Sequence, residues 1–268
     1  MARLKTSNTP DLDVLLAPTS AMTLAVEQAI LRGHKHSLAA IPVADKIAVR
    51  IAGAITVDAI HAGQRLLESD IGQVLQVSRA PVREALRILE RERLVEFRAR
   101  HGAVVTAPDA RDLADIYVVR DALYQILLRQ LLEENVDELR AVFSQHMPSL
   151  AKAANEASVD DYALQSFLLN LVMTDLSGNR VVVDLLTSIS LRTLRYVRMG
   201  LAANPELLQS SLKSWRALQR AIERRDVEAV LETARKRIAG SRDAAVRALA
   251  QPQADLRKPA RKPQLALQ

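Results

Sequence analysis

The sequence predicts a mainly α-helical protein that carries one small β-hairpin. Glycine and proline number only 8 and 10 in 268 residues, too few turn formers for a chain built of many strands. Aromatic residues make up 3%, so the core must consist mainly of Leu, Ala, Val and Ile, which pack well between helices. Along most of the chain the apolar residues recur at helical spacing, and in one short stretch they alternate with polar residues.

The composition restricts the class of protein further. Hydrophobic residues make up 49% of the chain, which excludes a disordered chain, and the absence of cysteine excludes disulfides, thiolate metal sites and cysteine nucleophiles. No apolar run approaches the roughly 18 residues of a membrane span. Asp11 and Asp13 argue against a signal peptide. We therefore expect a soluble cytoplasmic protein with no membrane partner. The net charge of +6 permits a polyanionic partner.

Residues 1–40 are expected to hold a tail and an extra helix. Residues 1–18 predict a mobile tail. Apolar residues at helical spacing then predict a helix over 20–32, which ends at Gly33 and is followed by a polar loop at 34–37. The sequence leaves the role of this extra helix open.

A unit of three helices and a hairpin is predicted over residues 41–107. The three helices are expected over 43–60, 68–75 and 79–92. Residues 76–77 make a tight connection between the second and third helices. Pro81 falls in the first turn of the third helix, where proline is tolerated. Ser78 could cap that turn, whereas Ala80 could not.

The third of these helices has two different faces. One face is apolar and can pack on the preceding helices, and another carries arginines one turn apart. A short helix, a tight turn and an arginine-bearing helix form helix-turn-helix geometry, in which the guanidinium fork suits guanine edges and phosphates. The alternative is a solvated face, partly neutralised by Glu84 and Glu90. The apolar residues are Val82, Ala85 and Leu89, and the arginines are Arg79, Arg83 and Arg87.

A β-hairpin is predicted over residues 94–106. Apolar and polar residues alternate on both sides of a turn at Gly102. The basic residues Arg98, Arg100 and His101 would lie near its tip, where they could approach a nucleic-acid backbone or minor groove.

The helical pattern continues from about residue 109 to residue 250, with short breaks. Such a pattern predicts an antiparallel bundle of about six helices as a second domain over 108–250. Residues 251–268 contain three prolines and four basic residues, and they predict a disordered basic tail. The six helices are expected over 110–133, 136–157, 159–176, 180–200, 205–224 and 226–249.

Residues 66–106 resemble the winged helix-turn-helix domain of the GntR family of bacterial transcription regulators. The likeness is best in VSRAPVREALRILE, residues 77–90. The resemblance implies that Arg79 and Arg83 contact double-stranded operator DNA, with the wing tip over 100–102 beside them. The residues expected at the DNA are Ser69, Ser78, Arg79, Ala80, Arg83, Arg87, Arg98, Arg100, His101 and Gly102.

The chain also departs from the pattern of this family. Ser69 opens the second helix, where arginine is frequent, and Ala80 replaces the usual Ser or Thr before the proline. Gln76 and Arg93 replace two usual glycines. These departures leave the expected fold intact.

The second domain resembles the FCD effector domain of the FadR subfamily. The resemblance rests on six helices, on Arg120 early in the domain and on Ser177-Gly178-Asn179 midway. Members of that domain often hold a divalent metal with one Asp and three His. None of the residues at those positions here is a good ligand for a transition metal, and four of the five histidines precede the bundle, so we expect no metal and no cofactor. The residues at those positions are Ser166, Asn170, Trp215 and Arg237.

The same four positions would face one cavity. A tryptophan face and an arginine head suit an organic anion through stacking and charge-assisted hydrogen bonds. We therefore expect a small acidic effector bound without metal near these residues and Arg120. The alternative is that Trp215 fills the cavity and the bundle serves only dimerisation.

The sequence predicts a homodimeric DNA-binding transcription regulator rather than an enzyme. It contains no Gly-rich phosphate loop, no His–Glu metal helix and no nucleophile elbow. The adjacent Asp160 and Asp161 are better explained by a helix start than by acid–base chemistry. A repressor and an activator both fit the sequence.

Overall fold

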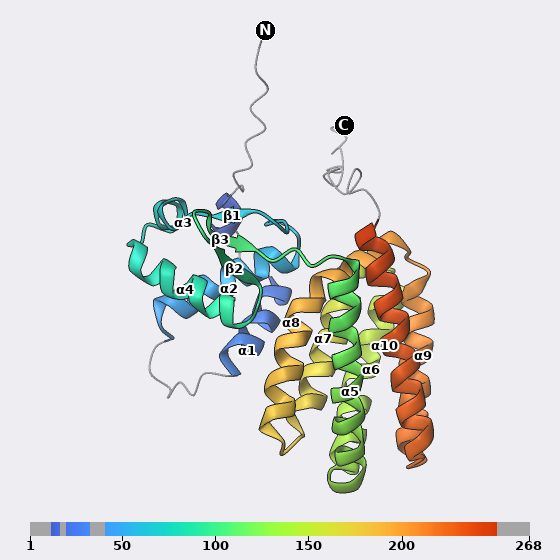
Figure 1. Ribbon diagram of the computed structural model, residues 1–268. Helices are drawn as coiled ribbons and strands as arrows, with labels where there is room; N and C mark the ends of the chain where they lie inside the picture. The colour runs from blue at the N-terminus through green and yellow to red at the C-terminus, as the bar shows by residue number, and fades with distance from the viewer. Residues whose placement is uncertain (1–11, 17–19, 33–40, 251–268) are drawn as a thin grey trace, which may run out of the picture.

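The computed structural model describes residues 12–16, 20–32 and 41–250. It consists of a smaller N-terminal part beside a helical bundle (Figure 1). The prediction of a mainly helical protein with a winged helix-turn-helix and a bundle is confirmed. We call residues 43–105, from α2 to β3, the winged unit. The elements before the bundle are a 3-10 helix (Leu12–Leu16), α1 (Ala21–Arg32), α2 (Val43–Thr56), β1 (Arg65–Leu66), α3 (Glu68–Leu75), α4 (Arg79–Arg91), β2 (Val95–Arg98) and β3 (Gly102–Val105).

The helix-turn-helix is formed by α3 and α4, and α4 packs on α2 and α3. Val82, Ala85 and Leu89 are buried, as their spacing predicts. The turn needs two unusual backbone features. Gln76 ends α3 in the left-handed region with φ of 54°. A Cβ on Gly72 would lie 2.9 Å from the Val77 carbonyl oxygen, so only glycine fits there without a shift.

The wing is a three-stranded antiparallel sheet in the order β1-β3-β2. Phe97 pairs with Ala103 and Arg98 with Gly102, which gives the expected hairpin. The short strand β1 adds a second strand pairing, with Arg65 opposite Val104, that the sequence did not predict.

Six helices form the bundle, as expected. Helix α10 packs on α5, α8 and α9, while α6 packs on α7 and α9. Local capping fixes several helix starts: Asp109 and Asp112 form a capping box on α5, and the Asn179 side chain accepts a hydrogen bond from the Val182 N–H on α8. The helices are α5 (Ala110–Glu134), α6 (Val136–Asn155), α7 (Val159–Asp175), α8 (Arg180–Ala203), α9 (Leu207–Glu223) and α10 (Val227–Ala250).

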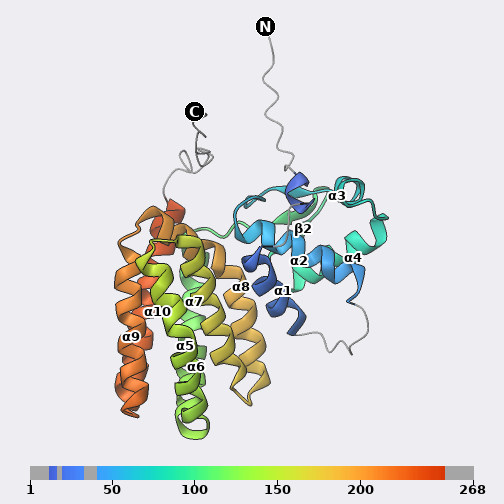
Figure 2. The same cartoon turned by 180° about the vertical axis from the view of Figure 1, so that it is seen from behind.

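The extra helix α1 lies between the winged unit and the bundle (Figure 2). It packs on α2 on one side and on α7 and α8 on the other. Its buried residues are Met22, Ala25, Val26, Ala29 and Ile30.

Two expectations for the N-terminal part are wrong. Leu12–Leu16 does not belong to a mobile tail, because it forms a 3-10 helix that buries Leu12 and Leu15 against α2 and α3. The helix expected over 43–60 ends at Thr56, since Asp58 adopts a left-handed backbone with φ of 62°. Parts of the expected tail and extra-helix segment, including the loop at 34–37, lie outside the described residues, as does the basic tail over 251–268.

Among the described helices, we find none with the length and apolar character that crossing a membrane requires.

Candidate functional site

The arginine face of α4 is open to solvent. Val82 and its apolar neighbours turn inward, which leaves Arg79, Arg83 and Arg87 on the outer side of the helix. All ten residues that we expected at DNA are exposed, and they come from the α3 start, the α4 outer face and the wing tip. They are Ser69, Ser78, Arg79, Ala80, Arg83, Arg87, Arg98, Arg100, His101 and Gly102.

Arg83 is held by Glu68 at the first turn of α3. Its Nε donates to Glu68 Oε1 at 2.9 Å, and its Nη2 donates to Oε2 at 2.8 Å. This hydrogen bond lowers the pKa of the Glu68 carboxyl, and it raises the pKa of Arg83. The Arg83 side chain stays 63% exposed, so the pair leaves the guanidinium accessible to a ligand.

The other two arginines of this exposed face, Arg79 and Arg87, differ in their partners. Arg87 donates to Glu90 at 2.7 Å, and its guanidinium lies 4.1 Å from the centre of the Phe97 ring on β2. Arg79 forms no hydrogen bond or ion pair with a described residue. Ser78 takes the N-cap backbone position, but its side chain accepts no capping hydrogen bond. The first N–H groups of α4 therefore remain available to an anion.

The wing tip carries a second basic group. Arg100 and Gly102 both have left-handed backbones, with φ of 63° and 72°, which closes the turn between β2 and β3. Arg98 pairs with Glu96, and His101 Nδ1 lies 3.0 Å from the Ala99 carbonyl oxygen. The tip therefore offers exposed cations close to a tight backbone turn.

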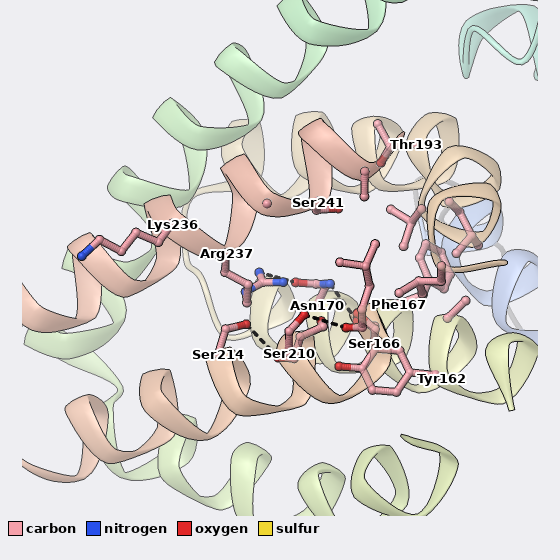
Figure 3. A pocket seen from close by; sticks show the side chains of 18 of the residues that line it. Tyr162, Ser166, Phe167, Asn170, Thr193, Ser210, Ser214, Lys236, Arg237 and Ser241 are labelled. Atoms are coloured by element: carbon pink, nitrogen blue, oxygen red, sulfur yellow. Dashed lines mark hydrogen bonds between the residues drawn. The ribbon is translucent and has the colours of Figure 1, made fainter. Parts of the chain in front are cut away.

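The bundle encloses a cavity of about 460 Å³ among α5, α7, α8, α9 and α10 (Figure 3). Four of the five residues expected at an effector line it: Arg120, Ser166, Asn170 and Arg237. The fifth, Trp215, does not. The cavity is lined by hydroxyl side chains, four basic side chains and an apolar wall, and no Asp or Glu lines it.

Trp215 lies behind Arg237 and is fully buried. The Arg237 guanidinium is 3.7 Å from the centre of the indole, and the centre of the Phe143 ring lies 5.9 Å from the centre of the indole. The expected stacking of a ligand on Trp215 is therefore wrong, because Arg237 already covers that face. Trp215 instead supports the arginine that reaches the cavity.

Asn170 connects the polar residues of the cavity. Its Oδ1 accepts a hydrogen bond from the Tyr124 hydroxyl at 2.6 Å and lies 3.4 Å from Arg237 Nη2. Its Nδ2 donates to the Ser166 carbonyl oxygen at 2.7 Å. The amide orientation is thereby fixed, which points the Arg237 head toward the cavity (Figure 3).

Arg120 enters the cavity from α5. Its Nη1 donates to Thr193 Oγ1 on α8 at 2.7 Å. The guanidinium lies 5.8 Å from the Tyr117 ring centre and 5.6 Å from that of Tyr124. Burial raises the pKa of Tyr117, so this ring stays neutral and supplies no counter-charge.

Helix α8 faces the cavity on one side and the winged unit on the other. Thr193 lines the cavity, while Arg195, two residues along, is buried and forms an ion pair with Asp58 in the turn after α2. Arg198 pairs with Asp160 at 2.5 Å and donates to the Val57 carbonyl oxygen at 3.3 Å. One helix thus joins the cavity to the winged unit.

Several of these residues were missed in the sequence. The sequence patterns pointed to no role for Glu68, Tyr124, Thr193 or Asp58. Serines at helical spacing on α9 were the available signal for a polar cavity, since Ser210, Ser211 and Ser214 recur on one side.

The four substituted metal positions hold no metal-binding set here. Within residues 12–16, 20–32 and 41–250, no group of three or more His, Asp or Glu side chains is placed to hold a metal ion.

These features define a winged helix-turn-helix unit joined to a ligand-sized helical cavity. The profile of the gntR family of bacterial regulatory proteins matches residues 43–105, and the profile of the FCD domain matches residues 115–240. The chain belongs to the GntR family and carries an FCD domain.

Relatives of known sequence agree with this assignment. The chain is 27% identical over 129 residues to an uncharacterised HTH-type transcriptional regulator, YdhC of Bacillus subtilis, across 48% of this chain and 58% of the relative. It is 31% identical over 111 residues to the gluconate operon transcriptional repressor of Bacillus licheniformis, across 41% and 45%. The matches thus span about half the length of these relatives.

Solved structures share the fold. A putative GntR regulator from Rhodococcus sp. RHA1 matches with a TM-score of 0.64 at 19% identity, over 75% of this chain and 96% of that one. Escherichia coli McbR/YncC matches with a TM-score of 0.65 at 17% identity, over 75% and 95%.

Proposed function

We propose that this protein is a dimeric transcription regulator that binds operator DNA through α4 and the wing and responds to a small acidic effector in the bundle cavity. The observation that carries the DNA-binding part is the face of Arg79, Arg83 and Arg87, exposed on a helix whose opposite face is buried. Its membership of a family of DNA-binding regulators supports the same reading. The proposal places the protein in the cytoplasm, where bacterial operators lie.

In this proposal α4 enters the major groove. Arg79 and Arg83 reach base edges, while the free N–H groups at the α4 start and Ser69 on α3 meet phosphates. Arg98, Arg100 and His101 approach the backbone or the minor groove beside them. Phosphate contacts set the register of the protein, and the α4 arginines supply the sequence preference.

The DNA-binding part is tested by gel shift on the DNA that flanks the protein's own gene. Arg79→Ala and Arg83→Ala should each weaken binding by about 1–3 kcal/mol while leaving the oligomeric state unchanged. Arg216→Ala, which removes an exposed arginine from α9, is the matched control and should bind as the wild type does. Unchanged affinity in both α4 variants would refute the proposal.

The homodimer is proposed to form across α5 and α8. These neighbouring helices carry exposed apolar side chains that a second copy would cover: Val118, Val119, Ile126, Val181 and Leu185. In sedimentation, Val181→Asp should shift the protein toward monomer. Leu24→Asp, at an exposed apolar position on α1, should not. A Val181→Asp protein that stays dimeric would exclude this face.

The effector is proposed to bind in the cavity without metal. Arg120 and Arg237 supply cationic hydrogen-bond donors there, and the positions of the family's metal ligands are substituted. The alternative, an effector-free bundle, is less well supported because a cavity of about 460 Å³ stays open beside the Trp215–Arg237 stack. Calorimetry with organic acids tests this, and binding that is lost on adding EDTA would refute it.

Repression is the mode of control that the similarity to gluconate operon repressors favours. A reporter gene behind the flanking promoter should be more active when the regulator is deleted. Lower activity on deletion would indicate an activator instead.

A further inference from the structure

We infer that the cavity binds a small organic dianion: either a dicarboxylate with one carboxylate facing Arg237 and the other facing Arg120, or a phosphate ester whose doubly charged group serves both arginines. This inference rests on the proposed effector function and goes further by fixing the charge of the ligand.

The two arginines of the cavity have no counter-charge among the described residues. Arg120, Lys213, Lys236 and Arg237 line the cavity, and no Asp or Glu does; of the four, Lys236 is paired with Glu232, which lies outside the lining. Neither Arg120 nor Arg237 forms an ion pair with a described residue. Surface arginines in the same bundle do find carboxylates, such as Arg235 with Asp121 and Glu232. Buried charges normally need compensation, so the two unpaired cavity arginines point to an anionic ligand.

Arg237 is the first of the two cationic anchors. Its Nε is buried and has no hydrogen-bond partner among the described residues, and the only polar contact of its head is the 3.4 Å approach to Asn170. Burial lowers its pKa to about 10, which still leaves it protonated at neutral pH. Trp215 fixes the guanidinium plane from behind. A group held in this way is preorganised for an oxyanion.

Arg120 is the second anchor. Only 7% of its surface is exposed, and Thr193 is its one hydrogen-bond partner among the described residues. The charge of Arg120 also lowers the pKa of Arg237, which means that the two cations repel each other across the cavity. A single negative charge would compensate one guanidinium and leave the other uncompensated. A ligand with two negative charges removes both penalties, so the charge count favours the dianion.

The remaining lining describes the body of the ligand. Ser166 and Ser190 are buried beside the arginines and offer hydroxyl donors and acceptors. Phe167, Leu194 and Val197 form an apolar wall. A short carbon chain with one apolar side fits this combination.

The test compares matched ligands on the full-length protein. Succinate, glutarate and adipate are each measured by calorimetry against butyrate, valerate and hexanoate, and glycerol 3-phosphate is measured against glycerol, all with EDTA at constant ionic strength. Inorganic phosphate is measured in the same way, as the phosphate group without the ester. The best dianion should bind at least tenfold more tightly than its singly charged or neutral match. The carboxylate and phosphate arms then identify which dianion chemistry the cavity takes.

Variants assign the preference to the two arginines. Arg237→Gln and Arg120→Gln should each reduce the dianion preference to less than threefold. Arg235→Gln, which removes an exposed arginine from the same turn of α10, is the matched control and should keep the preference. Circular dichroism and gel shift on the same samples confirm that each variant is folded and binds DNA.

The inference is overturned if no dianion binds better than its match, or if the preference survives in both cavity variants. Should an arginine variant fail to fold, the wild-type ligand series still decides. Retained DNA binding together with equal affinity for monoanions and dianions would refute the dianion while leaving the proposed regulator intact. If the wild-type protein does not bind DNA, the proposed function itself is refuted.

Discussion

Arg83 on α4 and Glu68 at the start of α3 form a bidentate ion pair across the helix-turn-helix. The carboxylate orients the guanidinium, and it also places a negative charge beside the face that would meet phosphates. Arg79 and Arg87 also lower the pKa of Glu68 through their charges, so this carboxylate sits within the cationic face. The arginine that we propose to face DNA is therefore shared with an internal competitor, Glu68.

Replacing Glu68 with Gln should strengthen DNA binding at low salt. The change removes a like charge from the DNA side and releases Arg83, so we expect affinity to rise about three- to tenfold and to fall more steeply with salt. Glu84→Gln, on the exposed face of α4, removes the same charge without releasing an arginine and should have a smaller effect. Gel shifts over a salt series provide the measurement. Weaker binding by Glu68→Gln alone would mean that orienting Arg83 matters more than repulsion.

Replacing Asp58 with Asn should destabilise the folded protein. Arg195 is 4% exposed and pairs with Asp58, and its Nε and Nη1 have no hydrogen-bond partner among the described residues. Losing the carboxylate strands a buried cation, which costs about 3–5 kcal/mol. Asn tolerates the left-handed backbone at this position, so the effect reports the charge. Urea unfolding measures it, with Asp184→Asn on the exposed side of α8 as control. A loss below about 1 kcal/mol would contradict the prediction.

Replacing Gln76 with Gly should stabilise the winged unit slightly. The left-handed backbone strains a side-chain-bearing residue, and relief of that strain outweighs the added freedom of the unfolded chain, for a net gain of about 0.5 kcal/mol. Gln73→Gly, three residues earlier inside α3, should instead cost about 1 kcal/mol. Thermal unfolding of both variants is the measurement. Equal destabilisation by the two changes would refute the strain argument.

Tyr162 should make stability fall at high pH. Burial raises its pKa to about 12, above the ordinary value near 10. The unfolded state therefore loses this proton first, so the contribution is complete below pH 10 and disappears as pH rises toward 12. The two-unit shift corresponds to about 2–3 kcal/mol. Tyr162→Phe should show a smaller loss of unfolding free energy between pH 9 and 11.5. Identical pH dependence in both proteins would contradict the assignment.

The regular parts of the fold could be predicted because their signals are long and periodic. The α4 residues Val82, Ala85 and Leu89 repeat over several turns, and the bundle helices carry the same pattern over longer stretches. The strand β1 spans two residues, which is too short to show any alternation. The 3-10 helix spans only five residues, and its two buried leucines are too few to show a period.

The candidate site could be predicted in part for a similar reason. Exposure of Arg79 and Arg83 follows from the burial of the opposite face of α4. The convergence of Arg120, Asn170 and Arg237 depended on the family resemblance, since these residues come from three helices. The position of Trp215 depends on a rotamer choice, and no sequence pattern states that an arginine covers its ring.

The position of α1 affects how the protein can be divided. The family profile begins at Val43, but α1 precedes it and wedges its apolar side chains against both α2 and the bundle. A shortened protein that begins at Val43 would lack α1 and would expose apolar surface on α2 and on the bundle. Any shortened version of the protein made for biochemistry should therefore keep residues 20–32 to avoid aggregation.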